Sequence, residues 1–221
     1  MTKRAISQPI IVLLYGFPGV GKTYFARQFC EHIQAAHIQA DRIRFELFEH
    51  PRYDKQENSV ITQLMRYMSE EFLSAGISVV YDDDLMRLGQ RHSLRELARK
   101  CHAKSLLVWF QMDTESSYLR NLKRDRRRID DKYAAAYDQT TFNNLIGQMQ
   151  NPASTEDYIV VSGKHTFSTQ FSTVARRLRE LGLLGVDELS PVVKPGMVNL
   201  VPKPNMQQGR FDPSRRNIVI R

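Results

Sequence analysis

The stretch that decides the fold is IIVLLYGFPGVGKTYFARQF, residues 10–29. Its first six residues, Ile10–Tyr15, form an uninterrupted apolar run, which is typical of a strand buried on both faces of a parallel sheet. Residues 16–23 then read Gly-Phe-Pro-Gly-Val-Gly-Lys-Thr, and residues 22–34 carry apolar side chains at helical spacing. The stretch therefore predicts a buried strand, a glycine-rich turn and an amphipathic helix in direct succession.

The glycine-rich turn fits the phosphate-binding pattern G-x-x-x-x-G-K-[ST]. Glycines let backbone N–H groups approach a phosphate closely, and the start of the helix adds positive potential. Lys22 would reach the β- and γ-phosphates of a nucleotide, and the Thr23 hydroxyl would bind Mg²⁺. A ligand-free turn is the alternative, but such a turn does not require Lys-Thr after its last glycine. We expect these residues to bind the nucleotide: Gly16, Pro18, Gly19, Val20, Gly21, Lys22, Thr23 and Tyr24.

An acidic cluster follows a second apolar run. Residues 79–82 read Val-Val-Tyr-Asp, and Asp83 and Asp84 come directly after them. An aspartate at the end of such a strand can hold Mg²⁺ beside a phosphate-binding loop. We therefore expect Asp82 to lie on the metal side of the site, with an ordinary polar turn as the alternative.

A candidate catalytic base lies in the segment Ala40-Asp41-Arg42-Ile43-Arg44, which follows a strand candidate at 37–39. The carboxyl ends of strands in an open α/β sheet face the ligand crevice, so Asp41 is placed near the phosphates. There it could accept a proton from a substrate hydroxyl, and Arg44, one turn later, could pair with a substrate anion. The alternative for Asp41 is that it only caps the helix.

Strand and helix patterns alternate along the rest of the chain, which predicts an α/β fold with a mostly parallel sheet covered on both faces. A polar loop is expected at 49–58. Strands are expected at 10–15, 37–39, 77–81, 106–111 and 158–161, and helices at 22–34, 41–48, 59–75, 89–101, 114–124, 138–149 and 168–182.

A basic run, LRNLKRDRRR at residues 119–128, follows the fourth strand candidate. A solvated helix face is the usual explanation for such runs. However, Arg120 and Arg124 are four residues apart and share one helical face, which favours a shaped anion site. Asp130 and Asp131 then reverse the charge, unlike a nucleic-acid-binding tract.

Composition limits the class of protein. The chain has 221 residues, 42% hydrophobic and 25% charged, which fits one globular domain. Cys30 and Cys101 are too few for a disulfide framework and fit a reducing cytoplasm. No apolar run reaches 18 residues, so we expect no membrane contact and a cytoplasmic location.

The net charge of +8 is uneven. Residues 190–221 hold six Lys or Arg residues against the single Asp212, and five of the nine prolines. We therefore expect a domain at 1–189 and a loosely ordered, Pro-rich basic C-terminal tail at 190–221, which could contact nucleic acid.

These motifs resemble the P-loop kinases of the zeta-toxin, chloramphenicol-phosphotransferase and polynucleotide-kinase type, the AAA-domain "predicted kinases". The similarity covers about residues 9–182 and rests on GFPGVGKT, QADRIRFELF, VVYDDDLMRLGQRHSLRELA, VWFQMDTESSYLRNLKRDRRR and NPASTEDYIVV. It implies a three-layer, adenylate-kinase-like fold with strand order 2-3-1-4-5, and ATP with Mg²⁺ as ligands. It also implies Asp41 as the base, Arg44 as a substrate contact, and a small basic lid at about 120–137 whose arginines bind the nucleotide: Arg120, Arg124 or Arg127. Relatives usually carry Thr or Asn where this chain has Asp83 and Asp84.

The sequence as a whole predicts a kinase that transfers the γ-phosphoryl of ATP to a hydroxyl of a small molecule or of a nucleic-acid 5′-end. Lys22, Asp41, Arg44 and Arg124 are the expected catalytic residues, and Thr23 and Asp82 the expected metal ligands. An ATP-binding regulatory protein with little turnover is the alternative.

Overall fold

The computed structural model describes residues 3–129, 131–135 and 137–185. The tail expected at 190–221 lies outside these residues and stays a prediction.

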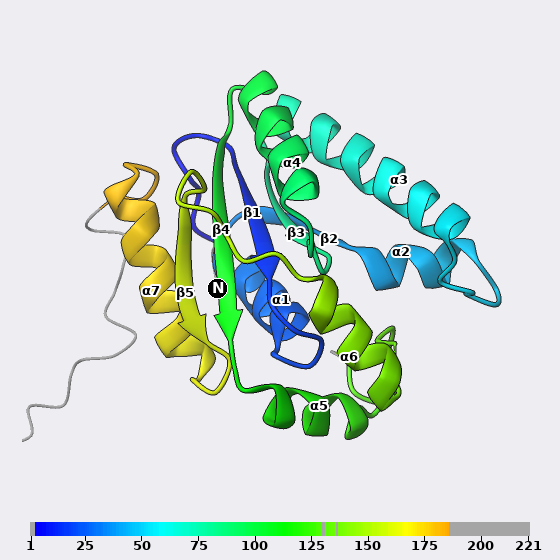
Figure 1. Cartoon of the computed structure of the whole chain (residues 1–221). Coiled ribbons are helices and arrows are strands. Elements are labelled where there is room, and N and C mark those ends of the chain that lie inside the picture. The colour runs from blue at the N-terminus through cyan, green and yellow to red at the C-terminus, as the bar shows by residue number, and fades with distance from the viewer. Residues whose placement is uncertain (1–2, 130, 136, 186–221) are drawn as a thin grey trace, which may run out of the picture. The chain divides into compact units, whose positions relative to one another are not determined.

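Five parallel strands form one sheet in the order β2-β3-β1-β4-β5, with β1 at its centre (Figure 1). The α/β fold class, the parallel sheet and the 2-3-1-4-5 order implied by the resemblance are confirmed. The chain leaves β1 for β2 on one side of it, returns to β3, and then crosses β1 to β4 on the other side. Connections on the two sides of β1 therefore run in opposite directions across the sheet, so a crevice opens at the carboxyl ends of the central strands. The strands are β1 (Ile10–Tyr15), β2 (Ala35–Gln39), β3 (Ser78–Asp82), β4 (Lys104–Gln111) and β5 (Tyr158–Ser162).

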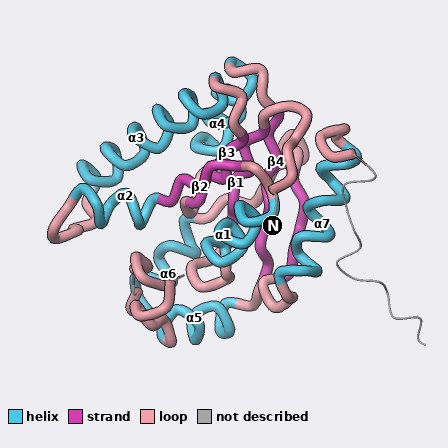
Figure 2. Tube along the Cα trace, turned by 180° about the vertical axis from the view of Figure 1, so that it is seen from behind, coloured by secondary structure: helices cyan, strands magenta, loops and turns pink. Residues whose placement is uncertain are grey.

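Helices cover both faces of the sheet and complete a three-layer fold (Figures 1 and 2). The α1 and α7 helices pack on one face, and α3 and α4 pack on the other. Helices α2 and α5 begin at the carboxyl ends of β2 and β4, and α6 follows α5 along the chain. The helices are α1 (Lys22–His32), α2 (Ala40–Leu47), α3 (Lys55–Ser74), α4 (Leu88–Lys100), α5 (Thr114–Leu122), α6 (Gln139–Gln148) and α7 (Phe167–Glu180).

The central strand β1 shows why both faces must be covered. All six of its residues are buried. Because successive side chains of a strand point to opposite faces, Ile10, Val12 and Leu14 join the core under α1 and α7. Ile11 and Leu13 join the core under α3 and α4. The continuous apolar run is therefore the sequence signature of a strand sandwiched between two helical layers.

The start of α3 differs from the sequence expectation. A loop was expected through residue 58, but α3 begins at Lys55 because Asp54 caps it, its side chain accepting a hydrogen bond from Glu57 N at 2.9 Å. Asp54-x-x-Glu57 is a helix-start pattern in which a short acidic side chain satisfies a free N–H of the first turn. The expected loop therefore ended four residues too late.

Candidate functional site

The largest concentration of predicted site residues lines one pocket of about 530 Å³ at the carboxyl ends of the strands. Its walls come from the glycine-rich loop, the ends of β2, β3 and β5, and the segment around α5. Of the predicted nucleotide-binding residues, all but Gly16 and the alternative lid residue Arg127 line this pocket: Pro18, Gly19, Val20, Gly21, Lys22, Thr23, Tyr24, Arg120 and Arg124.

The glycine-rich loop needs its glycines for two different reasons. Gly19 has a φ of 89°, and a Cβ at this position would collide with the Ser117 carbonyl oxygen of α5. Gly21 has a φ of 99°, and a Cβ there would meet nothing within 4 Å. Gly19 thus permits close packing against α5, and Gly21 permits the left-handed turn that starts α1.

Gly21 is also the N-cap residue of α1, and no side chain caps the helix. The first N–H groups of a helix have no partner within the helix, so they need a ligand, water or another group. These N–H groups begin at a loop that lines the pocket. The end of α1 therefore has the donor geometry and the positive potential that suit a phosphate.

Lys22 is held by three acceptors. Its Nζ donates to the carbonyl oxygens of Gly16 at 2.8 Å and Phe17 at 3.2 Å, and forms an ion pair with Asp84 Oδ1 at 3.0 Å. The residue is only 8% exposed, so its ammonium group is fixed against the loop. Asp84, for which the sequence suggested no specific role, is therefore the partner of the most strongly predicted residue.

The acidic turn after β3 lines the same pocket with all three of its aspartates. Asp82 is 4% exposed, and its Oδ2 lies 2.9 Å from His37 Nε2 on the neighbouring strand. Burial, followed by the nearby Asp84 carboxylate, raises the pKa of Asp83 to about 6. The turn therefore concentrates negative charge that a cation or the Lys22 ammonium group can balance.

Asp41 lies in the first turn of α2 and lines the pocket opposite the loop residues. Burial, then the Asp84 and Asp82 carboxylates, raise its pKa to about 7, while Arg124 acts in the opposite direction. The alternative that Asp41 caps α2 is wrong, because Gln39 is the N-cap residue. Asp41 is thus a carboxylate whose protonation state changes near neutral pH, as a positioned proton acceptor requires.

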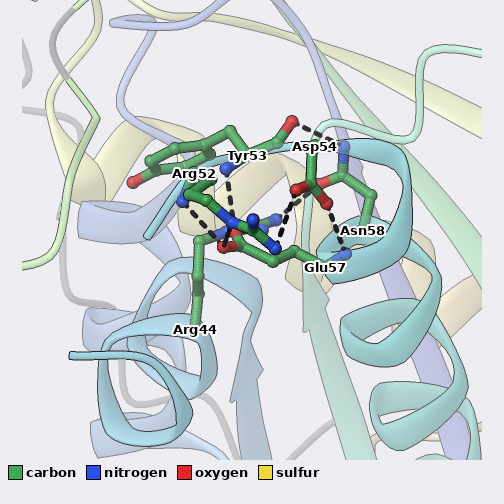
Figure 3. A network of polar contacts seen from close by, with 6 residues as sticks. All are labelled: Arg44, Arg52, Tyr53, Asp54, Glu57 and Asn58. Atoms are coloured by element: carbon green, nitrogen blue, oxygen red, sulfur yellow. Dashed lines mark hydrogen bonds and ion pairs between the residues drawn. The ribbon is translucent and has the colours of Figure 1, made fainter. Parts of the chain in front are cut away.

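Arg44 is not brought to this pocket. The residue is 6% exposed, and its Nη1 donates to Glu57 Oε2 at 3.1 Å while its Nη2 donates to Asn58 Oδ1 at 2.7 Å (Figure 3). Its guanidinium also lies 4.5 Å from the ring centroid of Tyr53. The expectation that Arg44 contacts a substrate is therefore not supported by this arrangement, which directs the side chain to the start of α3.

The basic run places some of its arginines in the pocket. Arg120 Nη1 donates to the Gly163 carbonyl oxygen at 2.8 Å, and Arg124 Nη1 donates to the Ala135 carbonyl oxygen. Lys123 and Arg128 also line the pocket, whereas Arg127 does not. The run is therefore divided between the pocket and solvent.

Sequence reasoning missed several further pocket residues. Tyr137 follows the basic run, and Gly163 and His165 follow β5. The rule that strand ends meet at one edge would have found Gly163 and His165, because β5 is parallel to β4. Tyr137 lies just before α6, and no sequence motif marks it as a pocket residue.

Besides Arg44 and Glu57, a second arginine–glutamate pair, Arg91 with Glu156, is buried next to the acidic turn. Arg91 is 0% exposed, and its Nε and Nη2 donate to the two carboxylate oxygens of Glu156 at 2.9 and 3.0 Å. Its Nη1 donates to the Leu85 carbonyl oxygen at 3.0 Å, one residue after Asp84. Arg91 therefore connects the acidic turn to the segment before β5.

The residues that line the pocket suit a nucleotide with a magnesium ion. Thr23 and Asp82 offer hydroxyl and carboxylate oxygens, which Mg²⁺ prefers. Within the described part of the chain, no group of three or more His, Cys, Asp or Glu side chains could hold a metal by itself. Mg²⁺ typically takes one or two protein ligands and completes its shell with phosphate oxygens and water. Thr23 and Asp82 together therefore suffice as its protein ligands.

Comparison with known proteins agrees with this geometry. The sequence profile of an AAA domain family matches residues 11–150, which include the loop, Asp41 and the acidic turn. The chain belongs to this AAA domain family. It is also 22% identical over 120 residues to L-seryl-tRNA(Sec) kinase from Methanococcus maripaludis, a match that covers 53% of this chain and 47% of that protein. The chain thus spans about half the length of this curated relative.

Solved structures share the fold at low identity. A gluconokinase from Sinorhizobium meliloti matches with a TM-score of 0.56 and 14% identity over 81% of this chain and 98% of that one. Kti12 from Chaetomium thermophilum, in complex with ADP-AlF3, matches with a TM-score of 0.59 and 14% identity over 76% and 97%. A putative kinase from Chloroflexus aurantiacus gives 0.61 and 11% over 79% and 98%. At these identities the likeness shows the fold alone, the three-layer P-loop NTPase fold.

Proposed function

We propose that this AAA domain protein is an ATP-dependent kinase that transfers the γ-phosphoryl group of ATP to a hydroxyl group. One observation carries the proposal: a phosphate-binding loop with a fixed lysine and a carboxylate with a pKa of about 7 line the same pocket. A nucleotide-binding module needs only the loop, whereas phosphoryl transfer to a hydroxyl group also uses a carboxylate placed beside the phosphates.

The chain's own residues supply binding and charge neutralisation. The N–H groups at the start of α1 and the Lys22 ammonium group would hold the phosphates, and Arg120 and Arg124 would neutralise the charge that develops during transfer. Thr23 and Asp82 would hold Mg²⁺, which would neutralise negative charge on the phosphate oxygens and so ease the approach of the hydroxyl group. Lys22 would exchange Asp84 for a phosphate oxygen.

Asp41 would orient the acceptor hydroxyl and take its proton as the new O–P bond forms and the bond from the γ-phosphorus to the β–γ bridging oxygen breaks, with ADP as the leaving group. Its raised pKa suits this task, because a carboxylate with an ordinary pKa would hold a proton weakly at neutral pH. Arg44 has no part in this step, since its guanidinium is bound to α3.

The relatives support a kinase without naming the acceptor for this chain. The similar proteins include a seryl-tRNA kinase and a gluconokinase, whose acceptors differ in size and chemistry. We also propose that the chain is most similar in function to zeta-toxin-like and polynucleotide kinases. Two further parts of the proposal are a nucleic-acid contact through the basic tail and a cytoplasmic location. Within the described residues, no helix is long and apolar enough to cross a bilayer.

The test is phosphoryl transfer from γ-labelled ATP to a panel of hydroxyl acceptors that includes 5′-hydroxyl oligonucleotides. Asp41→Asn keeps size and polarity but removes basicity, so we expect transfer to fall about 10²–10⁴-fold while Mg-ATP affinity changes little. Lys22→Ala should abolish transfer and weaken Mg-ATP binding. Glu46→Gln is a matched control, because it removes an exposed acid from the same helix.

The result separates the two functions. An ATP-binding regulatory protein would bind Mg-ATP but show equally feeble transfer in the wild type and in Asp41→Asn. A threefold or smaller loss of transfer in Asp41→Asn, with an active wild type, would remove Asp41 from the role of base.

A further inference from the structure

A second hollow, of about 740 Å³, lies beside the nucleotide pocket. Phe45 of α2, Tyr53 of the α2–α3 loop, and Arg126 and Tyr137 of the segment between α5 and α6 line it. We call it the aromatic hollow. Three of these four side chains are aromatic rings, and the fourth is a guanidinium group.

The aromatic hollow adjoins the nucleotide pocket at a shared wall residue. Tyr137 lines both. Phe45 follows Asp41 by four residues on α2, so the two share a helix face. Burial raises the pKa of Tyr53, and the nearby Asp41 carboxylate raises it further. Burial and the Asp84 carboxylate raise the pKa of Tyr137, and the Asp41 carboxylate adds to this effect. An occupant of the hollow would therefore present its hydroxyl group to Asp41.

Tyr53 is held in place by the buried network around Arg44. Its φ is 57°, a left-handed conformation that costs a residue with a side chain free energy. Its backbone N–H donates to Glu57 Oε2 at 2.8 Å, and Glu57 is itself 3% exposed (Figure 3). The Arg44 guanidinium lies 4.5 Å from the ring centroid of Tyr53. The network thus fixes the position of a half-buried ring on the wall of the hollow.

Arg126 supplies positive charge at the same hollow. Its guanidinium lies 5.8 Å from the Phe45 ring centroid, and Phe45 lies 5.9 Å from the Tyr133 ring. Among the described residues, no carboxylate forms an ion pair with Arg126. Asp138, which also lines the hollow, already accepts a hydrogen bond from Thr141 N to cap α6. Arg126 is the one Lys or Arg among the described residues that line the hollow, which the acids Glu49 and Asp138 also line. Without a carboxylate partner, its guanidinium is the group there that can meet an anion.

The geometry points to the aromatic hollow as the acceptor subsite, which takes a hydroxyl-bearing acceptor that combines a planar ring with an anionic group. The ring would stack against Tyr53 or Phe45, the anion would meet Arg126, and the hydroxyl would lie at Asp41. Planar rings stack on aromatic side chains, and guanidinium groups bind phosphate or carboxylate. This inference rests on the proposed kinase function, because it assigns the second substrate of that reaction.

The test is calorimetric binding to protein already saturated with Mg-ADP, which blocks the nucleotide pocket. The ring-bearing probe is cytidine 3′-monophosphate, which has a free 5′-hydroxyl group and one anion. The ringless probe is gluconate, which has hydroxyl groups and one anion. We expect the wild type to bind the cytidine probe at least tenfold more tightly than gluconate, by the contribution of stacking.

Two variants with matched controls locate the binding. Tyr53→Leu removes the ring, and we expect it to weaken the cytidine probe about tenfold; Tyr67→Leu removes a tyrosine that is 61% exposed on α3 and should change nothing. Arg126→Ala should weaken the same probe several-fold, whereas Arg127→Ala, which removes the neighbouring exposed arginine, should not. Gluconate binding should not respond to Tyr53→Leu.

Each outcome decides the inference. No binding of the cytidine probe, tighter binding of gluconate, or equal losses in the variants and their controls would overturn it. The proposed function is judged separately from Mg-ATP binding and transfer, so transfer to gluconate alone would keep the kinase and reject this subsite. If the inference holds, a 5′-hydroxyl trinucleotide that binds more tightly than the mononucleotide identifies a nucleic-acid end, and equal affinity identifies a free nucleotide.

Discussion

The phosphate side and the α2–α3 side of the site are each backed by a buried arginine–glutamate pair, but the pairs are built differently. Arg91 meets both carboxylate oxygens of Glu156, at 2.9 and 3.0 Å, and both side chains are at most 1% exposed. Arg44 meets one oxygen of Glu57, at 3.1 Å, and gives its other donor to Asn58. The first pair is a planar fork and the second is a branched network.

The connections of the two pairs also differ. Arg91 joins distant parts of the chain, because it also donates to the Leu85 carbonyl and lies 4.9 Å from the ring centroid of Tyr15, the residue before the loop. Glu57 gathers local groups, because it accepts from the backbone N–H groups of Arg52 and Tyr53. Arg91 therefore supports the central strand and the acidic turn next to the phosphate-binding loop, whereas Glu57 shapes one loop.

The largest expected effect follows from breaking the deeper pair. Arg91→Met leaves the Glu156 carboxylate buried without its cation, and we expect the free energy of unfolding to fall by about 3–5 kcal/mol. Replacing both partners, in Arg91→Met/Glu156→Leu, removes the unpaired charge and should restore part of that loss. Urea denaturation of both variants measures the two values.

The double variant is the informative one. If it is no more stable than Arg91→Met, the stability comes from the backbone hydrogen bonds of Arg91 and Glu156 rather than from their ion pair. Such a result would mean that the Arg91–Glu156 pair, like the Arg44–Glu57 pair, acts mainly through local hydrogen bonds. The difference between the two pairs described above would then be wrong.

The second effect comes from the loop pair. Glu57→Gln keeps the shape of the side chain but weakens three hydrogen bonds, so we expect a loss of about 1–2 kcal/mol in the free energy of unfolding. Mg-ATP affinity should not change, because Glu57 does not line the nucleotide pocket. Arg52→Ala is the control: its ion pairs with Asp54 and Glu57 are largely exposed on the arginine side, and it should change stability by less than about 0.5 kcal/mol. A Glu57→Gln protein with weakened Mg-ATP binding would contradict the separation of the two sides.

The third effect concerns the arginines that face the phosphate side. Arg120→Lys keeps the charge but loses the planar fork that reaches the Gly163 carbonyl oxygen at 2.8 Å, and Arg124→Lys loses the corresponding bond to Ala135. We expect each to weaken Mg-ATP binding or transfer about fivefold, near 1 kcal/mol. Arg127→Lys should have no effect. Full activity in both pocket variants would return the basic run to an ordinary solvated surface.

The phosphate side could be predicted from sequence because its signals are local. An apolar strand, a glycine-rich turn and Lys-Thr lie within 14 residues, 10–23. Asp82 and Asp41 followed from one rule, that the carboxyl ends of parallel strands face the crevice. These positions depend on the path of the backbone, which the periodic apolar residues specify.

The α2–α3 side could not be predicted in the same way. Three residues along a helix turn about 300°, so Arg44 is displaced by roughly 60° from Asp41, whereas Phe45 is displaced by about 40° in the opposite sense. The buried partner of Arg44, Glu57, lies in another helix, and no sequence pattern links the two. The Asp54-x-x-Glu57 pattern in the sequence indicates where α3 begins, but it does not indicate that Glu57 pairs with Arg44.

The smallest expected effect lies at Asp41, where the two sides meet. Its folded-state pKa of about 7 exceeds the ordinary value of 3.8, so the folded protein holds a proton that the unfolded chain releases between these pH values. Stability therefore falls as pH rises from about 4 to 7, because the folded state must bury a charge near Asp84 and Asp82. Asp41→Asn removes this cost. We expect the variant to melt about 2 °C above the wild type at pH 8, a small shift because Asp41 is only half-buried and solvent screens its charge.

The pH dependence distinguishes this cause from a general gain in packing. The difference in melting temperature between Asp41→Asn and the wild type should shrink as pH falls below about 7 and vanish well below the unfolded-state pKa of 3.8, where both states of the wild type are protonated. Glu46→Gln, on the exposed face of the same helix, should show no such trend. A melting temperature that is lower in Asp41→Asn at pH 8 would mean that the carboxylate is a favourable ionised partner in the folded protein. Asp41 would then belong to the charge balance with Lys22 and Arg124 on the phosphate side rather than to the junction with the aromatic hollow.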